Sequence, residues 1–305
     1  MTMTLEQAYA RCQQVAAAHY ENFPVASRLL PARMRPHVAA VYAFARVADD
    51  FADEGDVPSD QRLAWIDEWR TLRQQGPDAA HEATAVGRVP AEDVRSTFVA
   101  VHDTIAKCRL DPRLLDDLLS AFAQDVTTTR YDTWSAVLDY CRRSANPVGR
   151  LVLGIAGVHD EAAARHSDAV CTALQLANFW QDLGDDWRTR DRLYVPSDLL
   201  RECAADPRAL DSGVVTEAWS HVIDVLGART RALFEEGRPV CDAVRGRLRY
   251  ELRATWLGGT TILRRTLEVR RRSLHERPAL TRADLMRIAA GAIAWAPSGP
   301  ANHRA

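Results

Sequence analysis

Apolar residues recur at intervals of three and four along almost the whole chain, which is the spacing of one face of an α-helix. Alternating β-branched runs bounded by turn residues, the pattern typical of strands, do not occur. Proline and glycine mark the breaks, as at Pro31, Gly76-Pro77 and Asp206-Pro207. The pattern predicts an all-α protein with helices over 4–20, 32–54, 60–75, 91–108, 112–127, 133–157, 161–188, 213–236, 239–270 and 282–295.

No change in composition separates one part of these helices from another. We therefore expect residues 1–296 to form one domain. The polar, Ala-rich stretch from Gly76 to Pro90 is expected to be a linker. Residues 297–305 are expected to be a disordered tail.

The first candidate site lies at the end of the predicted helix 32–54, in the run YAFARVADDFADE. Its polar members Tyr42, Arg46, Asp49 and Asp53 are spaced by four, three and four residues, so in a helix they project from one face. Carboxylates four residues apart repel each other. We therefore expect a cation beside this row.

A second row lies in the run QLANFWQDLGDD. Gln175, Asn178, Asp182 and Asp186 share one helical face and offer only oxygen atoms or amides, with Gln181 next to them. The other faces are apolar, so this helix is predicted to be buried and its polar row to line a cavity or meet a partner.

The chemistry of the two rows favours a metal-assisted reaction. Taken alone, a DDxxD run is as well explained by a solvated helix face. Neither row, however, is matched by a row of Lys or Arg in the sequence. Carboxylates facing each other across a cleft need cations, and oxygen ligands without His or Cys favour Mg²⁺ or Mn²⁺ over zinc. Magnesium usually binds through one or two carboxylates plus substrate phosphates, and this geometry suits a diphosphate that is held between the rows and leaves as pyrophosphate.

Composition argues against several other classes of protein. The net charge of −2, without a run of like charges, gives no basis for binding nucleic acid. The six cysteines lie far apart without a CxxC pair, so they are expected to be reduced. A dinucleotide fingerprint, a Walker loop and a GxSxG motif are missing, so no NADPH site is predicted. Neither a signal peptide nor an 18-residue apolar segment occurs, which predicts a cytoplasmic protein and leaves open contact with the inner face of the membrane.

Together with YDTWSAVLDYCRRSANPVG from Tyr131 and DRLYVP from Asp191, the two rows resemble the squalene/phytoene synthase family. The resemblance runs from His19 to about Leu267. It implies a single-domain isoprenoid-synthase helical bundle with a central cavity. The residues that it implies for holding magnesium are Asp49, Asp53, Asn178, Asp182 and Asp186.

The same resemblance implies a substrate site. Tyr42, Arg46 and Gln175 stand where members of the family contact the diphosphate or shape the pocket. His19 matches the first position of the family's N-terminal segment that contacts the diphosphate. Tyr140 and Gly149 are implied to lie on the central helix that lines the hydrocarbon cavity.

The chain departs from the family pattern near the diphosphate. The usual HSxSF reads His19-Tyr20-Glu21-Asn22-Phe23, and the usual Arg before the first Asp of the second motif is Gln181. AGTVG reads ANPVG at residues 145–149, and Gly258-Gly259 stand where many members have an aromatic residue.

HYENFP, SANPVG and NFWQD resemble the bacterial hydroxysqualene synthase branch of the family. That branch ionises presqualene diphosphate, rearranges the cyclopropylcarbinyl cation and quenches it with water. An enzyme for this reaction binds one diphosphate, which agrees with the loss of the two hydroxyls and of the arginine at position 181. The reaction needs no reductant, which agrees with the missing dinucleotide fingerprint. Glu21 or Asn22 is expected to orient the water.

Three alternatives remain open at this point. The chain could be a head-to-head condensing synthase that makes presqualene diphosphate, dehydrosqualene or phytoene from prenyl diphosphates. A cyclising terpene synthase fits less well, because its second motif normally reads Asn/Asp, Ser/Thr, Glu. A non-catalytic assembly or binding protein of the same fold should have lost the acidic rows, which are intact here. Oligomeric state and any transient contact with a membrane or a pathway enzyme stay open.

Overall fold

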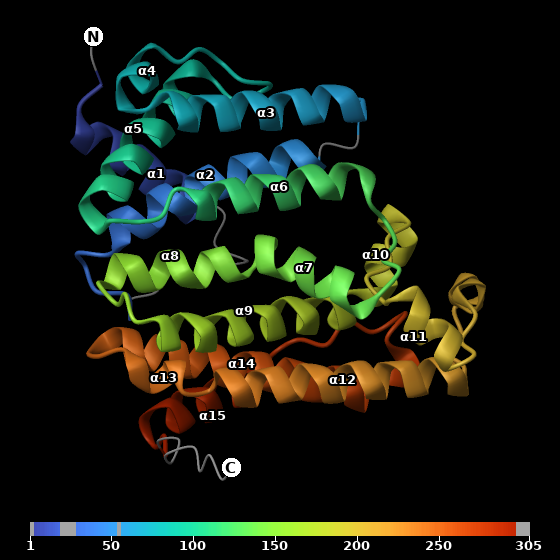
Figure 1. Ribbon diagram of the computed structural model, residues 1–305. Coiled ribbons are helices and arrows are strands. Elements are labelled where there is room, and N and C mark those ends of the chain that lie inside the picture. The colour runs from blue at the N-terminus through green and yellow to red at the C-terminus, as the bar shows by residue number, and fades with distance from the viewer. Residues whose placement is uncertain (1–2, 19–28, 54–55, 297–305) are drawn as a thin grey trace. The chain divides into compact units, whose positions relative to one another are not determined.

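The computed structural model describes residues 3–18, 29–53 and 56–296 of the 305-residue chain (Figure 1). Within these ranges the regular structure is helical, and β-type pairing is limited to the isolated bridges Val86–Val89 and Arg130–Leu193. The prediction of an all-α fold is confirmed. The expected tail 297–305 lies outside the described residues.

The chain divides into two compact units. Unit 1 comprises Met1–Thr127 and Pro147–His159, and unit 2 comprises Thr128–Asn146 and Asp160–Ala305. Each unit is therefore built from two separate stretches of sequence. Neither could be cut out as one continuous fragment, and a single domain over 1–296 stays a prediction.

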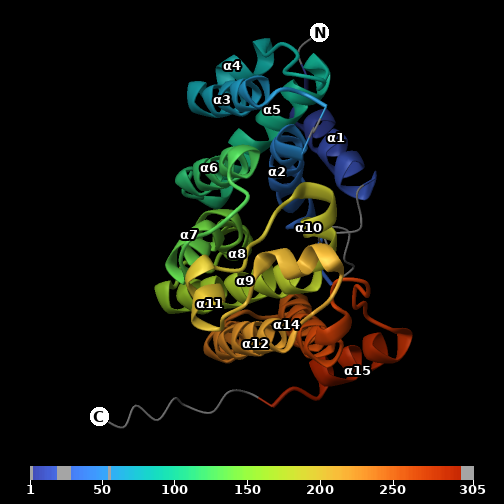
Figure 2. The same cartoon turned by 90° about the vertical axis from the view of Figure 1, so that its right-hand side faces the viewer.

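Unit 1 holds the helix with the first acidic row. Its helices are α1 (Leu5–Ala18), α2 (Arg35–Asp53), α3 (Ser59–Gln75), α4 (Pro77–Glu82), α5 (Ala91–Cys108), α6 (Arg113–Thr127) and α8 (Asn146–Ala156), the last entering from Asn146 of unit 2. α1 packs on both α2 and α5 (Figure 2).

An aromatic cluster fixes α2 against its neighbours. Trp69 of α3 lies 4.5 Å from Phe98 of α5 and 5.9 Å from Phe44 of α2, between ring centroids. All three rings are fully buried, and the indole N–H of Trp69 donates to the carbonyl oxygen of Phe44 at 3.3 Å. Large buried aromatics dominate core energetics. The cluster therefore anchors the helix whose outer end carries the acidic row.

Unit 2 is arranged around a long helix that ends in the second acidic row. Its elements are α7 (Trp134–Ser144), α9 (Glu161–Gln181), α10 (Leu183–Arg190), α11 (Ser197–Glu202), η2 (Pro207–Ser212), α12 (Glu217–Gly237), α13 (Val240–Ala243), α14 (Arg247–Glu268), η3 (Arg270–Arg272) and α15 (Arg282–Ile293). α9 packs lengthwise on α12 and also on α14.

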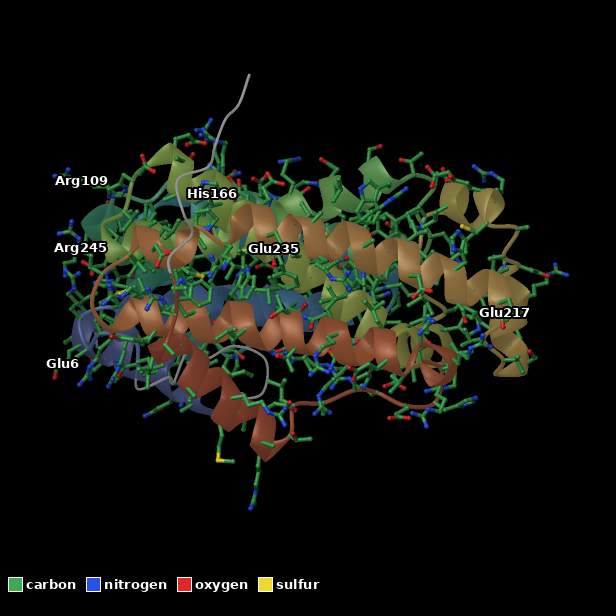
Figure 3. All side chains as sticks on the ribbon, turned by 90° about the horizontal axis from the view of Figure 1, so that it is seen from below. Glu6, Arg109, His166, Glu217, Glu235 and Arg245 are labelled. Atoms are coloured by element: carbon green, nitrogen blue, oxygen red, sulfur yellow. The ribbon has the colours of Figure 1, made fainter. Side chains whose placement is uncertain are left out.

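Close contacts hold α9 in place. At one end, His166 Nδ1 lies 2.8 Å from the carbonyl oxygen of Glu236 in α12. Figure 3 labels His166 of α9 and Glu235 of α12. At the other, the buried indole N–H of Trp180 donates to Thr230 Oγ1 at 2.9 Å. A Cβ on Gly259 of α14 would lie 2.5 Å from Leu174 Cδ2, so this glycine allows α14 to approach α9. A larger residue could not stand there without a shift.

The structure corrects two of the predicted helices. Segment 133–157 is not one helix, because it breaks at Ala145. Pro147 has no N–H to continue the ladder, but it suits the first turn of a new helix, α8. Segment 161–188 breaks at Asp182, although the Asp182 N–H still bonds to Asn178 O and the Asp186 N–H to Asp182 O, at 2.8 and 2.9 Å. The polar row therefore continues across the junction.

Two smaller predictions are also wrong. The expected linker from Gly76 to Pro90 contains α4, whose Ala80 is fully buried and which packs on α5. Its alanines supply enough apolar surface to be covered. The expected helix 239–270 is divided at Gly246, whose φ of +66° is left-handed and ends regular α-helix.

Candidate active site

The first acidic row opens into a cavity of about 210 Å³ inside unit 1. Tyr42, Arg46 and Asp49 of α2 form its polar end. The remaining wall is apolar and comes from α2, α6 and α8, through Val38, Val41, Ala45, Leu118, Phe122, Val148, Leu151, Val152 and Ile155. The cavity thus joins one charged end to a continuous apolar wall, as a molecule with a polar head and a hydrocarbon chain requires.

The electrostatics of this polar end favour an added cation. The Arg46 guanidinium lies 3.5 Å from an Asp49 carboxylate oxygen and donates to Asp50 at 3.2 Å. Partial burial, and then the neighbouring Asp53 carboxylate, raise the pKa of Asp49 to about 7. Burial also raises the pKa of Tyr42. Arg46 contacts both Asp49 and Asp50, yet the pKa of Asp49 stays raised, so an added cation would stabilise the ionised form of Asp49.

The second row lies within unit 2, on α9 and α10. Gln175 is half-buried and Asn178 is exposed, while Asp182 stands between the two helices. Burial raises the pKa of Asp186 to about 6, an effect opposed by Arg190. Each row therefore contains one carboxyl group whose pKa is raised chiefly by desolvation. That the two rows face each other stays a prediction, since each is described within its own unit.

A segment far along the sequence is fastened to the second row. We call residues 273–281, between η3 and α15, the C-terminal strap. Arg277 of the strap donates to both carboxylate oxygens of Asp182, at 2.5 and 3.2 Å. The Gln181 side chain donates to the carbonyl oxygen of Pro278 at 2.5 Å, and Arg188 donates to that of Leu274.

The strap corrects the interpretation that the acidic rows lack matching cations. Besides Arg277 on Asp182, Arg188 lies 2.6 Å from Asp185, and Arg190 lies 3.8 Å from Asp186. Sequence reasoning missed Arg277 because it is 95 residues from its partner. The local arginines are one helical turn away from their partners and could have been found by spacing alone.

The other predicted substrate residues have different surroundings. Gln181 is buried, with its amide engaged by Pro278. Tyr140 lies on α7 in an aromatic cluster of unit 2 with Tyr131, Phe179 and Tyr194. Gly149 lies on α8, one of the three helices that line the cavity, next to the lining residue Val148. His19, Glu21 and Asn22 lie outside the described residues.

The carboxylate and amide side chains of the two rows fit Mg²⁺ better than they fit a metal whose ligands all come from the protein. Among the described residues no three His, Cys, Asp or Glu side chains gather closely enough to enclose an ion. Magnesium does not need such a cage, because it keeps waters and takes phosphate oxygens with one or two carboxylates. Burial raises the pKa of Asp49 and of Asp186, and a bound divalent cation would favour the ionised form of both carboxyl groups.

Comparison with known proteins defines the class. The family model for squalene/phytoene synthase matches residues 16–284, a span that contains residues of both units. The chain belongs to the squalene/phytoene synthase family. It is thus an enzyme with an isoprenoid-synthase helical fold, and the alternative of a non-catalytic binding protein is wrong.

Relatives narrow the comparison within the family. The chain is 36% identical over 227 residues to the hydroxysqualene synthase of Rhodopseudomonas palustris, covering 74% of this chain and 72% of that protein. It is 34% identical over 282 residues to that of Sinorhizobium fredii, covering 91% and 90%. The crystal structure of the squalene synthase HpnC from Alicyclobacillus acidocaldarius is similar with a TM-score of 0.76 at 37% identity, covering 88% and 95%.

Proposed function

We propose that the chain is a hydroxysqualene synthase. In this reaction presqualene diphosphate ionises with the help of Mg²⁺, the cation rearranges, and water captures it to release hydroxysqualene and pyrophosphate. The relatives named hydroxysqualene synthase support this at 34–36% identity. Within the structure, the observation that carries the proposal is the apolar cavity that ends at Tyr42, Arg46 and Asp49.

The cavity suits a long hydrocarbon attached to a diphosphate. At about 210 Å³ the cavity is smaller than the ~300–1,000 Å³ of pockets that enclose a whole ligand, so it would hold one part of the substrate's hydrocarbon. Leu118, Phe122 and Leu151 would cover this part and exclude water from the cation. Arg46, at the polar end, would bind diphosphate oxygens.

Each step balances without an external reductant. The carbon–oxygen bond to the diphosphate breaks, and the diphosphate leaves with the electron pair. The oxygen of water then bonds to the rearranged cation and loses a proton to solvent. When bound, Mg²⁺ would neutralise the charge of the leaving diphosphate. Asp49 and Asp53 would hold the metal at the first row, and Asn178, Asp182 and Asp186 would hold it at the second row.

A condensing synthase is the second candidate, and one observation favours it. The missing family arginine at position 181 argues against binding two diphosphates, yet Arg277 of the strap brings a guanidinium to the same row. The loss of positive charge is therefore smaller than the sequence indicates. Phytoene synthases are also relatives of the chain, at 27% identity over 245 residues for that of Synechococcus elongatus.

Incubation with single substrates separates the two candidates. Purified protein with Mg²⁺ is given presqualene diphosphate or, separately, farnesyl diphosphate, and the products are identified by mass. We expect a thirty-carbon alcohol from presqualene diphosphate without NADPH and little consumption of farnesyl diphosphate. Efficient use of farnesyl diphosphate, or a hydrocarbon product, would replace the proposal with the condensing reaction. The Asp49→Asn variant shows whether any product depends on the first row.

A further inference from the structure

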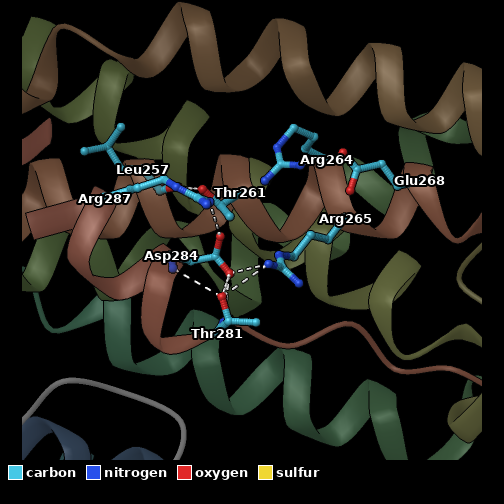
Figure 4. Close-up of polar contacts among 8 residues, drawn as sticks. All are labelled: Leu257, Thr261, Arg264, Arg265, Glu268, Thr281, Asp284 and Arg287. Carbon is cyan, nitrogen blue, oxygen red and sulfur yellow. Dashed lines mark hydrogen bonds and ion pairs between the residues drawn. The ribbon is translucent and has the colours of Figure 1, made fainter.

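The last described helix, α15, is fixed by one face on α14. Asp284, Ile288 and Ala292 of α15 are buried, and a Cβ on Gly291 would lie 3.1 Å from Leu257 Cδ1 of α14. Asp284 caps the helix through Thr281 and pairs with Arg265 of α14 at 2.5 Å (Figure 4). These contacts determine the rotation of α15, so they also determine which residues point away from α14.

The face that points away is apolar. Met286 is 71% exposed and Ile293 is 75% exposed, and they lie seven residues apart, on the same side of the helix. Ala289 and Ala290 are exposed between them, and Leu285, 54% exposed, lies at the edge. A surface helix normally carries polar residues opposite its packed face. We call Arg282, Met286, Ala289, Ala290 and Ile293 the outer face of α15.

This concentration is specific to α15. The described residues include five exposed large apolar side chains, and three of them belong to this helix of twelve residues. The other two, Leu29 and Val214, are single residues outside regular helix. Scattered apolar residues need no explanation, whereas a gathered set marks a surface that meets something apolar.

The charged side chains that α15 itself exposes have one sign. Asp284, the acidic residue of α15, is buried, so the charged side chains that α15 exposes are those of Arg282 and Arg287. Arg287 is 73% exposed at its side chain although it contacts Asp284 at 3.1 Å. An apolar stripe bordered by arginine complements a surface that carries negative charge outside and has an apolar layer beneath it.

We propose that the outer face of α15 docks the enzyme onto an anionic lipid surface, with Met286 and Ile293 inserted among the acyl chains and Arg282 at the headgroups. Helices of this kind lie in the interface, and their affinity combines apolar burial with attraction to anionic lipid. None of the described helices has the length and apolar composition to cross a bilayer. Three large side chains on three turns are also too few for the ~1,200 Å² that a stable dimer buries. The proposal concerns a surface of unit 2 and does not depend on which reaction the enzyme performs.

The test is flotation of the full chain with phosphatidylcholine vesicles that contain or lack phosphatidylglycerol. We expect binding to the anionic vesicles only, weakened as salt rises. Met286→Glu and Ile293→Glu should each weaken it roughly tenfold or more. Arg282→Ala should weaken it roughly fivefold. The matched control is Val214→Glu, which makes the same change at a 55%-exposed residue away from α15 and should bind as the unaltered chain does.

Melting temperatures of all variants should equal that of the unaltered chain, because the changed residues are exposed. Failure of the unaltered chain to bind anionic vesicles would overturn the proposal, as would equal binding by Met286→Glu. A concentration-dependent dimer that Met286→Glu abolishes would assign the outer face to a second copy instead. Turnover in detergent should be the same for Met286→Glu and the unaltered chain, which separates this result from that of the proposed reaction.

Discussion

The Asp49→Asn substitution should stabilise the protein while it removes activity. In the structure the Asp49 carboxylate lies partly desolvated at the polar end of the cavity, four residues from Asp53. Its pKa is raised to about 7, against an ordinary value of 3.8. The folded protein is thus destabilised by ionisation of this group. The wild-type chain should lose stability from it as pH rises from about 4 to about 7.

The size of the effect follows from the contacts. Like charges four residues apart on a helix cost ~0.2–0.5 kcal/mol, and partial burial adds to this. The Asp49 side chain is still 41% exposed, so solvent screens much of its charge. The substitution also removes the 3.5 Å contact with Arg46, which lowers the gain in stability only slightly because Arg46 keeps its ion pair with Asp50. We expect a net gain of about 0.5–1 kcal/mol at pH 8, or roughly 1–4 °C in Tm.

The assay is thermal unfolding in EDTA at several pH values, with turnover measured in Mg²⁺. The difference in Tm between Asp49→Asn and wild type should be small at pH 5, grow through pH 7 and then stay constant. Turnover should fall by about a hundredfold or more, as when a group that stabilises transition-state charge is removed. The reasoning is refuted by a variant that is less stable at pH 8, by a difference independent of pH, or by near-wild-type turnover.

Further predictions concern both rows and the cavity. Asp53→Asn and Asp182→Asn should each lower turnover by about a hundredfold or more without unfolding the protein, and wild-type activity in both would end the two-row account. Gly149→Leu should block turnover while leaving binding of magnesium and pyrophosphate nearly unchanged; equal loss of both, measured by calorimetry, would make Gly149 structural. Arg277→Gln breaks a partly exposed ion pair worth less than ~1 kcal/mol, so Tm should shift by no more than about 4 °C. The same variant should bind magnesium and pyrophosphate more weakly, and unchanged affinity would limit Arg277 to fastening the strap.

Local signals in the sequence predicted most helices because the forces that start a helix are local. Thr133 and Asp160, which precede helices predicted at 133 and 161, each accept the backbone N–H three residues ahead, at 3.2 and 2.7 Å. Thr216 does the same at 3.3 Å, but the helix there was predicted to begin too early, at residue 213. Helical spacing likewise predicted that Tyr42, Arg46 and Asp49 share a face, and all three line the same cavity.

Contacts between distant residues could not be predicted in this way. The pairing of Arg277 with Asp182 joins residues 95 positions apart, and no spacing rule selects one arginine among so many. The breaks at Ala145 and Asp182 fall inside patterns that remain helical on either side. For α15 the sequence predicted the helix but not its uncovered side, because both faces are apolar and only contact with α14 distinguishes them.

The measurement that tests the proposed function most directly is the fate of oxygen from water. Presqualene diphosphate is incubated with the enzyme and Mg²⁺ in ¹⁸O-labelled water, without NADPH, and the thirty-carbon product is analysed by mass spectrometry. The account predicts an alcohol that carries one heavy oxygen, because water alone captures the cation. A hydrocarbon, or an alcohol without the label, would contradict it.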